Sequence, residues 1–245
     1  MSEHRLFVPP ESIRGDSVHI TGSLAHKLRI VLRLKAGDHI VVLDNSSTER
    51  EVRIESLRGG EVRGSVLTTG QCANEPTTRI ALFQALLKGS SFDLVLQKCT
   101  EIGVSGFVPV MSERCVAREP GPARADRWER IVLEAAQQSR RGLLPPIHPV
   151  TSFDEACRSS TGPSLILWEG ERIAGLKDVL HSLKESDPVS INVFVGPEGG
   201  FSIQETELAR ASGIIPTSMG GRILRAETAG LAASAALLYE FGEMG

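Results

Sequence analysis

From Arg79 onward the sequence alternates short apolar runs with longer stretches of helical periodicity, and this alternation limits the fold more than any other feature. The apolar runs cover residues 80–87, 107–111, 164–168, 191–195 and 214–219. Helical patterns separate them at residues 93–102, 125–141, 176–185, 203–211 and 228–241. Strands that are apolar along their whole length are typical of a parallel sheet with helices on both faces. The sequence therefore predicts an α/β fold built on a parallel sheet.

The residues before this region show a different pattern, in which apolar stretches of strand length alternate with residues typical of turns. These stretches are residues 6–8, 17–20, 39–43, 51–54 and 61–67. Their spacing predicts a small β-barrel, interrupted by one helical segment from about Ser23 to Arg33. Residues 69–78 are polar, contain a proline and are predicted to form a linker.

Composition narrows the class of partner and disfavours several kinds of site. The chain has 245 residues and a formal net charge of −3, so any contact with nucleic acid needs positive charge gathered locally. The four cysteines form no CxxC pair and no metal-ligand spacing, so we expect no metal and no disulfide framework. Neither a signal-type start nor an apolar run of about 18 residues is found. We expect a cytoplasmic protein without membrane contact.

The helical segment near the start carries such local charge. Residues 26–35 contain four Lys or Arg residues and no acid. At about 100° per residue, one face of this segment carries His26, Arg29 and Arg33, and the opposite face is apolar, consisting of Leu24, Leu28, Val31 and Leu32. Guanidinium groups match phosphate oxygens, so the basic face is a candidate RNA contact. An ordinary solvated surface is the alternative explanation.

A second polar row runs along residues 125–141. It consists of Arg127, Arg130, Glu134, Gln137, Gln138 and Arg141. The opposite side, from Trp128 to Ser139, is mostly apolar and predicts a helix that covers the sheet. Arginines and amides in one row suit a polynucleotide backbone and base edges. A plain covering helix explains the same pattern.

The run Gly196-Pro197-Glu198-Gly199-Gly200 follows the predicted strand at residues 191–195. The next helix starts with a capping box, in which Ser202 is the N-cap and Glu205 stands three residues later. Ligands of open α/β sheets bind outside the carboxyl ends of strands, where glycines let the backbone approach a cofactor. The run has neither the lysine of a P-loop nor the GxGxxG pattern, which disfavours ATP and NAD. A nucleotide-like ligand and a plain tight turn both remain possible interpretations.

A second glycine-bearing segment, residues 219–229 (MGGRILRAETA), leads from the last predicted strand into a helix with few charges. Leu231, Ala235, Leu238 and Tyr239 line one face of that helix, and alanines cover most of the rest. A helix that is apolar nearly all round is buried, either in the core or against another subunit. Two such loops at strand ends favour a shared ligand site.

Residues 196–202 (GPEGGFS) and 221–229 (GRILRAETA) resemble the signatures of the bacterial 16S rRNA (uracil-N3) methyltransferases, a family of the SPOUT class with a trefoil knot. The resemblance extends over almost the whole chain. Further matching segments are His26 with Val31-Leu32-Arg33 and Gly37-Asp38, Lys88-Gly89, Asp93, residues 97–104, residues 112–114, and Glu134-Ala135 with Gln137-Gln138-Ser139 and Arg141. The departures are Met219 for leucine, Ala226 for threonine and Cys99 for alanine. None removes a charge or a glycine, so we expect activity to be retained.

The resemblance implies a fold, a cofactor and partners. It implies a PUA-like β-barrel over residues 1–72 that helps to hold RNA, and a knotted SPOUT domain over residues 73–245. The implied cofactor is S-adenosylmethionine, and the implied reaction is methylation of N3 of a specific uridine in 16S rRNA. The implied partners are the assembled small ribosomal subunit and a second copy of the chain in a homodimer.

The resemblance also assigns residues to these tasks. The implied cofactor-binding residues are Leu167, Trp168, Glu169, Val195, Gly196, Pro197, Glu198, Gly199, Gly200, Met219, Gly220, Ile223, Leu224, Arg225, Thr228 and Ala229. The expected RNA contacts are His26, Arg29, Arg33, Lys88, Lys98, Arg114 and Arg141.

The implied methyl transfer requires two contributions from the protein. A sulfonium is already an activated methyl donor, so the protein must align the methyl group with N3 and help to remove the N3 proton. Glu198 is a candidate base and Arg225 a candidate stabiliser of the uracil anion. The alternatives are that Glu198 only fixes its loop, and that Arg225 forms an ion pair with Glu227.

Two other functional classes stay open on the sequence alone. One is a non-catalytic RNA-binding or ribosome assembly factor with a vestigial cofactor site. The other is a phosphate- or nucleotide-binding enzyme that uses the glycine-rich loop.

Overall fold

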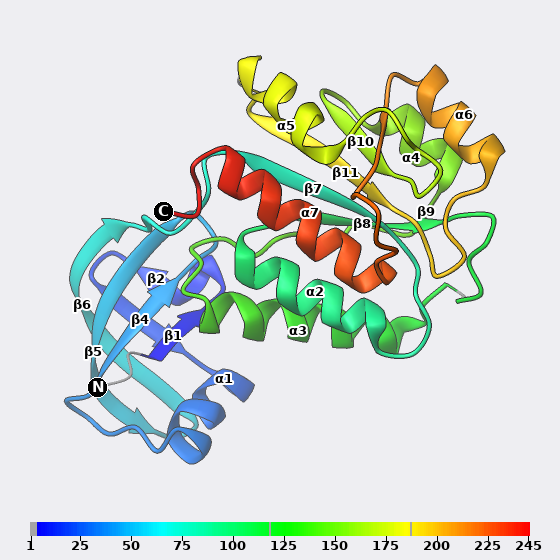
Figure 1. Cartoon of the computed structure of the whole chain (residues 1–245). Helices are drawn as coiled ribbons and strands as arrows, with labels where there is room; N and C mark the ends of the chain where they lie inside the picture. Colours follow the sequence, from blue (N-terminus) through cyan, green and yellow to red (C-terminus); the bar gives the residue numbers. More distant parts are fainter. Residues whose placement is uncertain (1–3, 118, 187) are drawn as a thin grey trace. The chain divides into compact units, whose positions relative to one another are not determined.

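The computed structural model describes residues 4–117, 119–186 and 188–245, and its contacts divide the chain into two compact units (Figure 1). The first unit contains the described part of Met1–Glu75 together with Ala136–Leu144. The second contains the described parts of Pro76–Ala135 and Pro145–Gly245. The grouping of Ala136–Leu144 with the first unit was not expected from the sequence.

The first unit is built on a six-stranded sheet in the order β1-β4-β5-β6-β3-β2. Its strands are β1 (His4–Phe7), β2 (Ile13–Arg14), β3 (Ser17–Ile20), β4 (His39–Leu43), β5 (Thr48–Arg58) and β6 (Glu61–Gln71). A short 3-10 helix, η1 (Pro10–Ser12), precedes β2. The β1–β4 pair is parallel and the other pairs are antiparallel. The sheet is therefore mixed, and among the described residues its strand order does not close into a ring.

Alternating apolar residues of these strands form the core of the first unit. Ile40 and Val42 of β4, and Val52 and Ile54 of β5, are at most 1% exposed. Leu28 packs against the same cluster and is fully buried. The period of two that predicted strands here therefore corresponds to an inward face of the sheet.

The predicted helix over residues 23–33 is shorter and less regular than expected. A helix α1 (Gly22–His26) continues into a π-helical turn, η2 (Lys27–Val31). A π turn holds more residues than an α turn, so side chains drift away from the predicted faces. Val31, predicted to share the buried face of Leu28, is 65% exposed.

Arg33 lies beyond the helix and not on its basic stripe, which corrects the prediction. The Leu34 N–H donates to the Leu28 carbonyl at 3.1 Å, closing the helix end. This closure places Arg33 in the left-handed region with a φ of +55°. Glycine is the usual residue at such a position, because a Cβ there clashes with the backbone.

The second unit contains the predicted parallel sheet, which is confirmed. Six strands pair in the order β12-β10-β11-β7-β8-β9, and every pair is parallel. They are β7 (Arg79–Ala85), β8 (Gly106–Met111), β9 (Thr151–Ser152), β10 (Ser164–Leu167), β11 (Ser190–Val195) and β12 (Ile215–Thr217). Five of these correspond to the five apolar runs of the sequence.

Helices cover both faces of this sheet, as expected. They are α2 (Ser91–Ile102), α3 (Pro122–Gln138), α4 (Phe153–Ser159), α5 (Leu176–Glu185), α6 (Ile203–Ala211) and α7 (Ala226–Glu240). One apolar cluster joins α2, α5 and α7 to alternate strand residues such as Val193 and Val195. A second cluster joins α4 and α6 to the other side of the strands, including Phe194. Successive residues of β11 thus point to opposite faces.

The last helix, α7, lies beside α2 and is covered on one side (Figure 1). Gly230, Ala233, Ser234 and Leu237 are buried, whereas Tyr239 is 72% exposed. The expected burial in the core therefore holds for one side of the helix, and the alternative of burial against another subunit stays a prediction for the other side. Strand β9 and helix α4 were missed, although Ser152 and Glu155 form an N-cap hydrogen bond of 3.2 Å at a Ser-x-x-Glu pattern.

We predict that Arg33→Gly raises the free energy of unfolding by about 1 kcal/mol, because it removes the Cβ from a left-handed position. Chemical denaturation of the full chain measures this change. The matched control is Arg29→Gly in the π turn, where φ is not positive, and it is expected to lower stability. A destabilised Arg33→Gly protein would contradict the prediction.

Candidate functional site

A cleft of about 840 Å³ opens in the second unit, at the carboxyl ends of β10 and β11. Three loops line it, which follow β10, β11 and β12 respectively, and Ser91 at the start of α2 also contributes. The chain leaves β10 toward α5 on one face of the sheet and leaves β11 toward α6 on the other. Loops that diverge from neighbouring parallel strands leave a crevice in which such sheets bind ligands.

The cleft brings together nearly all the residues predicted to bind a cofactor. From the loop after β10 come Leu167, Trp168 and Glu169; from the loop after β11 come Val195, Gly196, Pro197, Glu198 and Gly200; and from the segment after β12 come Met219, Gly220, Ile223, Leu224, Arg225 and Ala229. Gly199 and Thr228 are not among the lining residues. Residues more than fifty positions apart in the sequence therefore share one cavity.

Two glycines of the loop after β11 have conformations or neighbours that a side chain would disturb. Gly200 has a φ of +67°, and a Cβ there would lie 3.5 Å from the Glu169 carboxylate across the cleft. A Cβ at Gly196 would lie 3.2 Å from the Phe201 ring and 3.3 Å from the Gly200 carbonyl carbon. Glycine is therefore required by the tight path of the loop.

This loop is held by the loops that follow β7 and β8. A carboxylate oxygen of Glu198 accepts the backbone N–H of Lys88 at 2.9 Å. The Arg114 guanidinium donates to the Gly199 carbonyl at 2.9 Å. A Cβ on Gly199 would lie 3.2 Å from the Arg114 Cβ. A Cβ on Gly199 would therefore face Arg114, and the predicted contact of this residue with the cofactor stays a prediction.

The capping box predicted at the start of α6 is confirmed. Ser202 Oγ accepts the Glu205 N–H at 3.2 Å, and the Glu205 carboxylate accepts the Ser202 N–H at 2.9 Å. The second oxygen of Glu205 accepts the Glu113 N–H at 2.8 Å. The cap thus fixes the helix start and also fastens the loop after β8 to it.

A buried carboxylate that sequence reasoning missed organises the loop after β10. Glu171 is 7% exposed, and it accepts the N–H groups of Arg172, Ile173 and Ala174 at 2.9, 2.8 and 3.3 Å. The Arg210 guanidinium donates to it at 2.6 Å. These bonds, led by that from Ile173, hold the pKa of Glu171 below its ordinary value.

Gly170 is a second missed residue in this loop. A Cβ on Gly170 would lie 2.4 Å from the Trp168 ring, so the indole lies against bare backbone. Trp168 in turn lines the cleft and packs against the cluster that contains Phe194. The Trp-Glu-Gly sequence could have signalled this, because glycine often marks a close approach of ring and chain.

Arginines and carboxylates line the cleft together. Arg172, Arg222 and Arg225 line it together with Glu169, Glu198 and Glu227. The Arg225 side chain is 86% exposed and stands 3.9 Å from the Glu227 carboxylate, a separation at which an exposed pair is weak. The predicted alternative of an Arg225–Glu227 ion pair is therefore observed.

The residues predicted to contact RNA differ in exposure and in their internal partners. His26, Arg29 and Arg33 of the first unit are exposed, as are Lys88 and Arg114 of the second. Lys98 is half-buried and forms an ion pair with Glu101 at 2.8 Å. Arg29, Arg33, Lys88 and Arg114 therefore present a cation to a partner without breaking an ion pair among the described residues.

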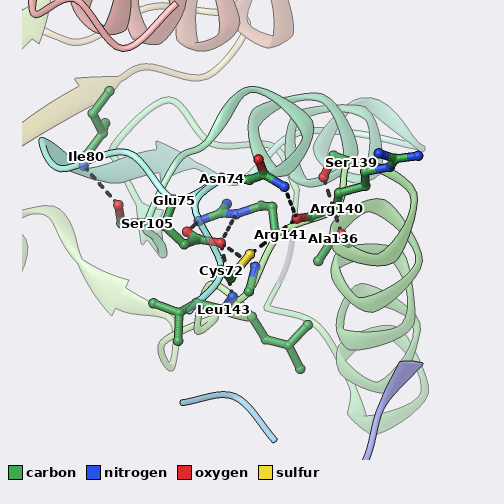
Figure 2. Close-up of polar contacts among 12 residues, drawn as sticks. Cys72, Asn74, Glu75, Ile80, Ser105, Ala136, Ser139, Arg140, Arg141 and Leu143 are labelled. Atoms are coloured by element: carbon green, nitrogen blue, oxygen red, sulfur yellow. Dashed lines mark hydrogen bonds and ion pairs between the residues drawn. The ribbon is translucent and has the colours of Figure 1, made fainter. Parts of the chain in front are cut away.

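Arg141 is an internal residue, and its prediction as an RNA contact is wrong. It is 3% exposed, and it donates to both carboxylate oxygens of Glu75, at 3.3 and 2.8 Å (Figure 2). The same carboxylate accepts the N–H groups of Gly142 and Leu143 at 2.8 and 3.0 Å. Helix α3 ends at Gln138, so Arg141 leaves the polar row of that helix and turns inward.

Two of the four cysteines are buried thiols of raised pKa. Burial raises the pKa of the Cys99 and Cys157 thiols to about 12, so both stay protonated at neutral pH. Within residues 4–117, 119–186 and 188–245, no group of three or more metal-ligating side chains comes together. None of the helices in this part of the chain is long and apolar enough to cross a membrane.

Comparison with known proteins defines the class to which this fold and cleft belong. The model of the RNA methyltransferase domain family matches residues 73–238. These residues include all three loops of the cleft. The chain therefore belongs to the RNA methyltransferase family.

Individual relatives carry a more specific name, ribosomal RNA small subunit methyltransferase E. The protein of that name from Synechocystis is 37% identical over 92% of this chain and 74% of its own. The Bacillus subtilis protein is 28% identical over 90% and 89%. The Neisseria gonorrhoeae protein, solved bound to S-adenosyl methionine, is 32% identical, covers 97% of both chains and has a TM-score of 0.87. The family predicted from residues 196–202 and 221–229 is confirmed.

We predict that Glu171→Gln reduces the loss of stability in acid. The folded pKa of Glu171 is lowered, so its contribution is complete above the ordinary value of 4.5 and disappears as the pH falls through the folded pKa. Wild-type protein should therefore lose more free energy of unfolding between neutral pH and about pH 3 than Glu171→Gln does. Denaturant titrations across this range measure the difference.

The control for this titration is Glu207→Gln, since Glu207 is exposed on α6 in the same unit. It should lose as much stability in acid as the wild type. Identical pH dependence in wild type and Glu171→Gln would show that the carboxylate does not hold the loop.

Proposed function

We propose that this protein transfers a methyl group from S-adenosylmethionine to N3 of a specific uridine in 16S ribosomal RNA. The observation that carries the proposal is the cleft itself, in which three loops from the ends of β10, β11 and β12 converge. The Neisseria gonorrhoeae relative, which matches 97% of this chain, was solved with S-adenosyl methionine. The uridine N3 position rests on the family signatures at residues 196–202 and 221–229.

The lining suits this cofactor in shape and in chemistry. The bare backbone at Gly200, where a Cβ would point toward Glu169 of the lining, leaves room for a ligand to lie close to the chain. Met219, Ile223 and Leu224 supply apolar surface for an adenine ring. When bound, the cofactor supplies an electrophilic methyl group on a sulfonium. The lining also carries arginines and carboxylates, which match the carboxylate and the two positive charges of the cofactor.

The protein must also take the proton that N3 loses when the N3–methyl bond forms. Glu169, Glu198 and Glu227 are the carboxylates of the lining. Because Glu198 accepts the Lys88 N–H, we assign it the task of positioning the loop. Arg225, whose side chain is 86% exposed, is the group we assign to the uracil anion or a neighbouring phosphate.

The two units divide the work in this proposal. The first unit contains the PUA-like module predicted over residues 1–72 and holds RNA. The second unit contains most of the domain predicted over residues 73–245 and carries out methyl transfer. We further propose that the second is threaded as a SPOUT trefoil knot. Supporting this, Ser218 after β12 exchanges backbone hydrogen bonds with Ala174 and Leu176 at 2.8 and 2.9 Å, beside the loop that follows β10.

We also propose a homodimer that acts in the cytoplasm on the assembled small subunit. The uncovered side of α7, with Tyr239 at its end, is apolar and suits contact with a second copy. Light scattering across a range of protein concentrations tests this, and a monomer at all concentrations would contradict it.

Replacement of Gly200 by alanine should weaken S-adenosylmethionine binding at least tenfold. Its Cβ both strains a φ of +67° and approaches Glu169. The control is Gly213→Ala, because Gly213 has a φ of +80° but no atom within 4 Å of the added Cβ. The control carries similar backbone strain and should bind normally. Calorimetry measures both affinities. An equal loss of S-adenosylmethionine affinity in the two variants would show that Gly200 does not contact the cofactor.

The reaction is tested with small ribosomal subunits from cells that lack the enzyme. Purified protein and labelled S-adenosylmethionine should place one methyl group on N3 of one uridine of 16S rRNA, mapped by mass spectrometry. Methyl groups on tRNA or protein would overturn the substrate assignment. Cofactor binding without any transfer, or RNA binding without cofactor binding, would favour a ribosome assembly factor.

The role of Glu198 is separated by two substitutions in the same assay. If its carboxylate only accepts the Lys88 N–H, Glu198→Gln keeps an acceptor and should retain turnover within about threefold, a loss below 1 kcal/mol. Glu198→Ala should then lose turnover tenfold or more, about 1.4 kcal/mol. Equal loss in both variants would instead identify Glu198 as the base.

A further inference from the structure

The segment 26–35 of the first unit, called the basic tip here, gathers four Lys and Arg residues and contains no acidic residue. Lys27, Arg29, Arg33 and Lys35 form no ion pair among the described residues. Many other cations of the chain are paired, for example Arg50 of the same unit with Asp44 at 3.0 Å. A cluster of like charges without acids is an electrostatic cost that an anionic partner relieves.

Two aliphatic side chains among these cations are exposed to solvent. Ile30 is 50% exposed and Val31 is 65% exposed. The π-helical turn over Lys27–Val31 causes this, since a regular α-helix places Val31 beside buried Leu28. Such turns occur frequently at functional sites.

The basic tip ends at an arginine, Arg33, whose backbone is strained. Arg33 occupies a left-handed conformation with a φ of +55°, where glycine is the unstrained choice. A residue that keeps a long cationic side chain at such a position points to a use for the guanidinium. The π turn, the exposed pair and the strained arginine lie within seven consecutive residues, Lys27–Arg33.

We propose that the basic tip binds RNA at unpaired nucleotides, with Ile30 and Val31 against an exposed base and Arg29 and Arg33 on the flanking phosphates. This deepens the proposed function by naming the RNA structure that the first unit recognises, and it rests on RNA being the substrate. A continuous RNA duplex hides its base faces and displays phosphates and groove edges. Aliphatic side chains gain contact area only where a base is unstacked.

The test compares two RNAs of equal length by fluorescence anisotropy with the full chain, in the absence of methyl donor. One is a hairpin with an unpaired loop and the other is a blunt duplex. Ile30→Ser with Val31→Ser should weaken hairpin binding about tenfold and leave duplex binding unchanged. Arg29→Ala with Arg33→Gly should weaken both and lower the salt dependence of log K by about 0.7 for each cation removed.

The matched controls lie in the same unit. Leu67→Ser replaces an apolar side chain that is 47% exposed on β6. Arg63→Ala removes an exposed cation that pairs with Glu61 at 3.1 Å. Both controls should bind like the wild type. Because Arg33→Gly relieves strain, its loss of binding cannot come from unfolding.

The outcomes separate this inference from the function on which it rests. If the tip variants bind RNA with wild-type affinity and methylate subunits normally, the proposal that the basic tip binds RNA fails and the proposed function stands. Weakened binding to assembled subunits but not to the hairpin would also overturn the proposal for the basic tip and indicate a protein partner. If wild-type protein neither binds RNA nor methylates subunits, the proposed function itself fails.

Discussion

The parallel pairing of β10 with β11 on one side and β12 on the other is the constraint on which the candidate site depends. Ile166 lies opposite Phe194, and Leu167 lies opposite Thr217, so the three strands end at nearly the same level. Their loops therefore begin side by side, although they are far apart in the sequence. Because both flanking faces of this sheet are packed, the register cannot slip without moving apolar residues to the wrong face.

The glycine-rich loop and the start of α6 are held by the loops that follow β7 and β8. Glu198 takes the N–H of Lys88, Arg114 reaches the Gly199 carbonyl, and Glu205 takes the N–H of Glu113. These bonds to the neighbouring loops fix the position of the backbone before a ligand arrives. A site that is already ordered loses less conformational entropy on binding. Charged residues of the sequence signature thus serve geometry as much as chemistry.

The sequence was sufficient for elements whose pattern is local and insufficient where long-range contacts decide. Strand β11, helix α6 and its capping box follow from an apolar run and a Ser-x-x-Glu motif, and all were predicted. The buried position of Arg141 was not predicted, because its partner Glu75 is 66 residues away in the sequence. The loop-forming task of Glu171 was hidden for a related reason, since three of its four bonds are to backbone groups. Val31 was misplaced because a π turn leaves no clear trace in apolar periodicity.

Hydrogen exchange of the full chain with and without S-adenosylmethionine tests the central claim most directly, that one cleft built from the ends of three parallel strands holds the methyl donor. We predict slower amide exchange in residues 168–175, 196–200 and 218–225, with little change in the first unit. Protection confined to the first unit, or the absence of protection in all three loops at saturating cofactor, would contradict the claim.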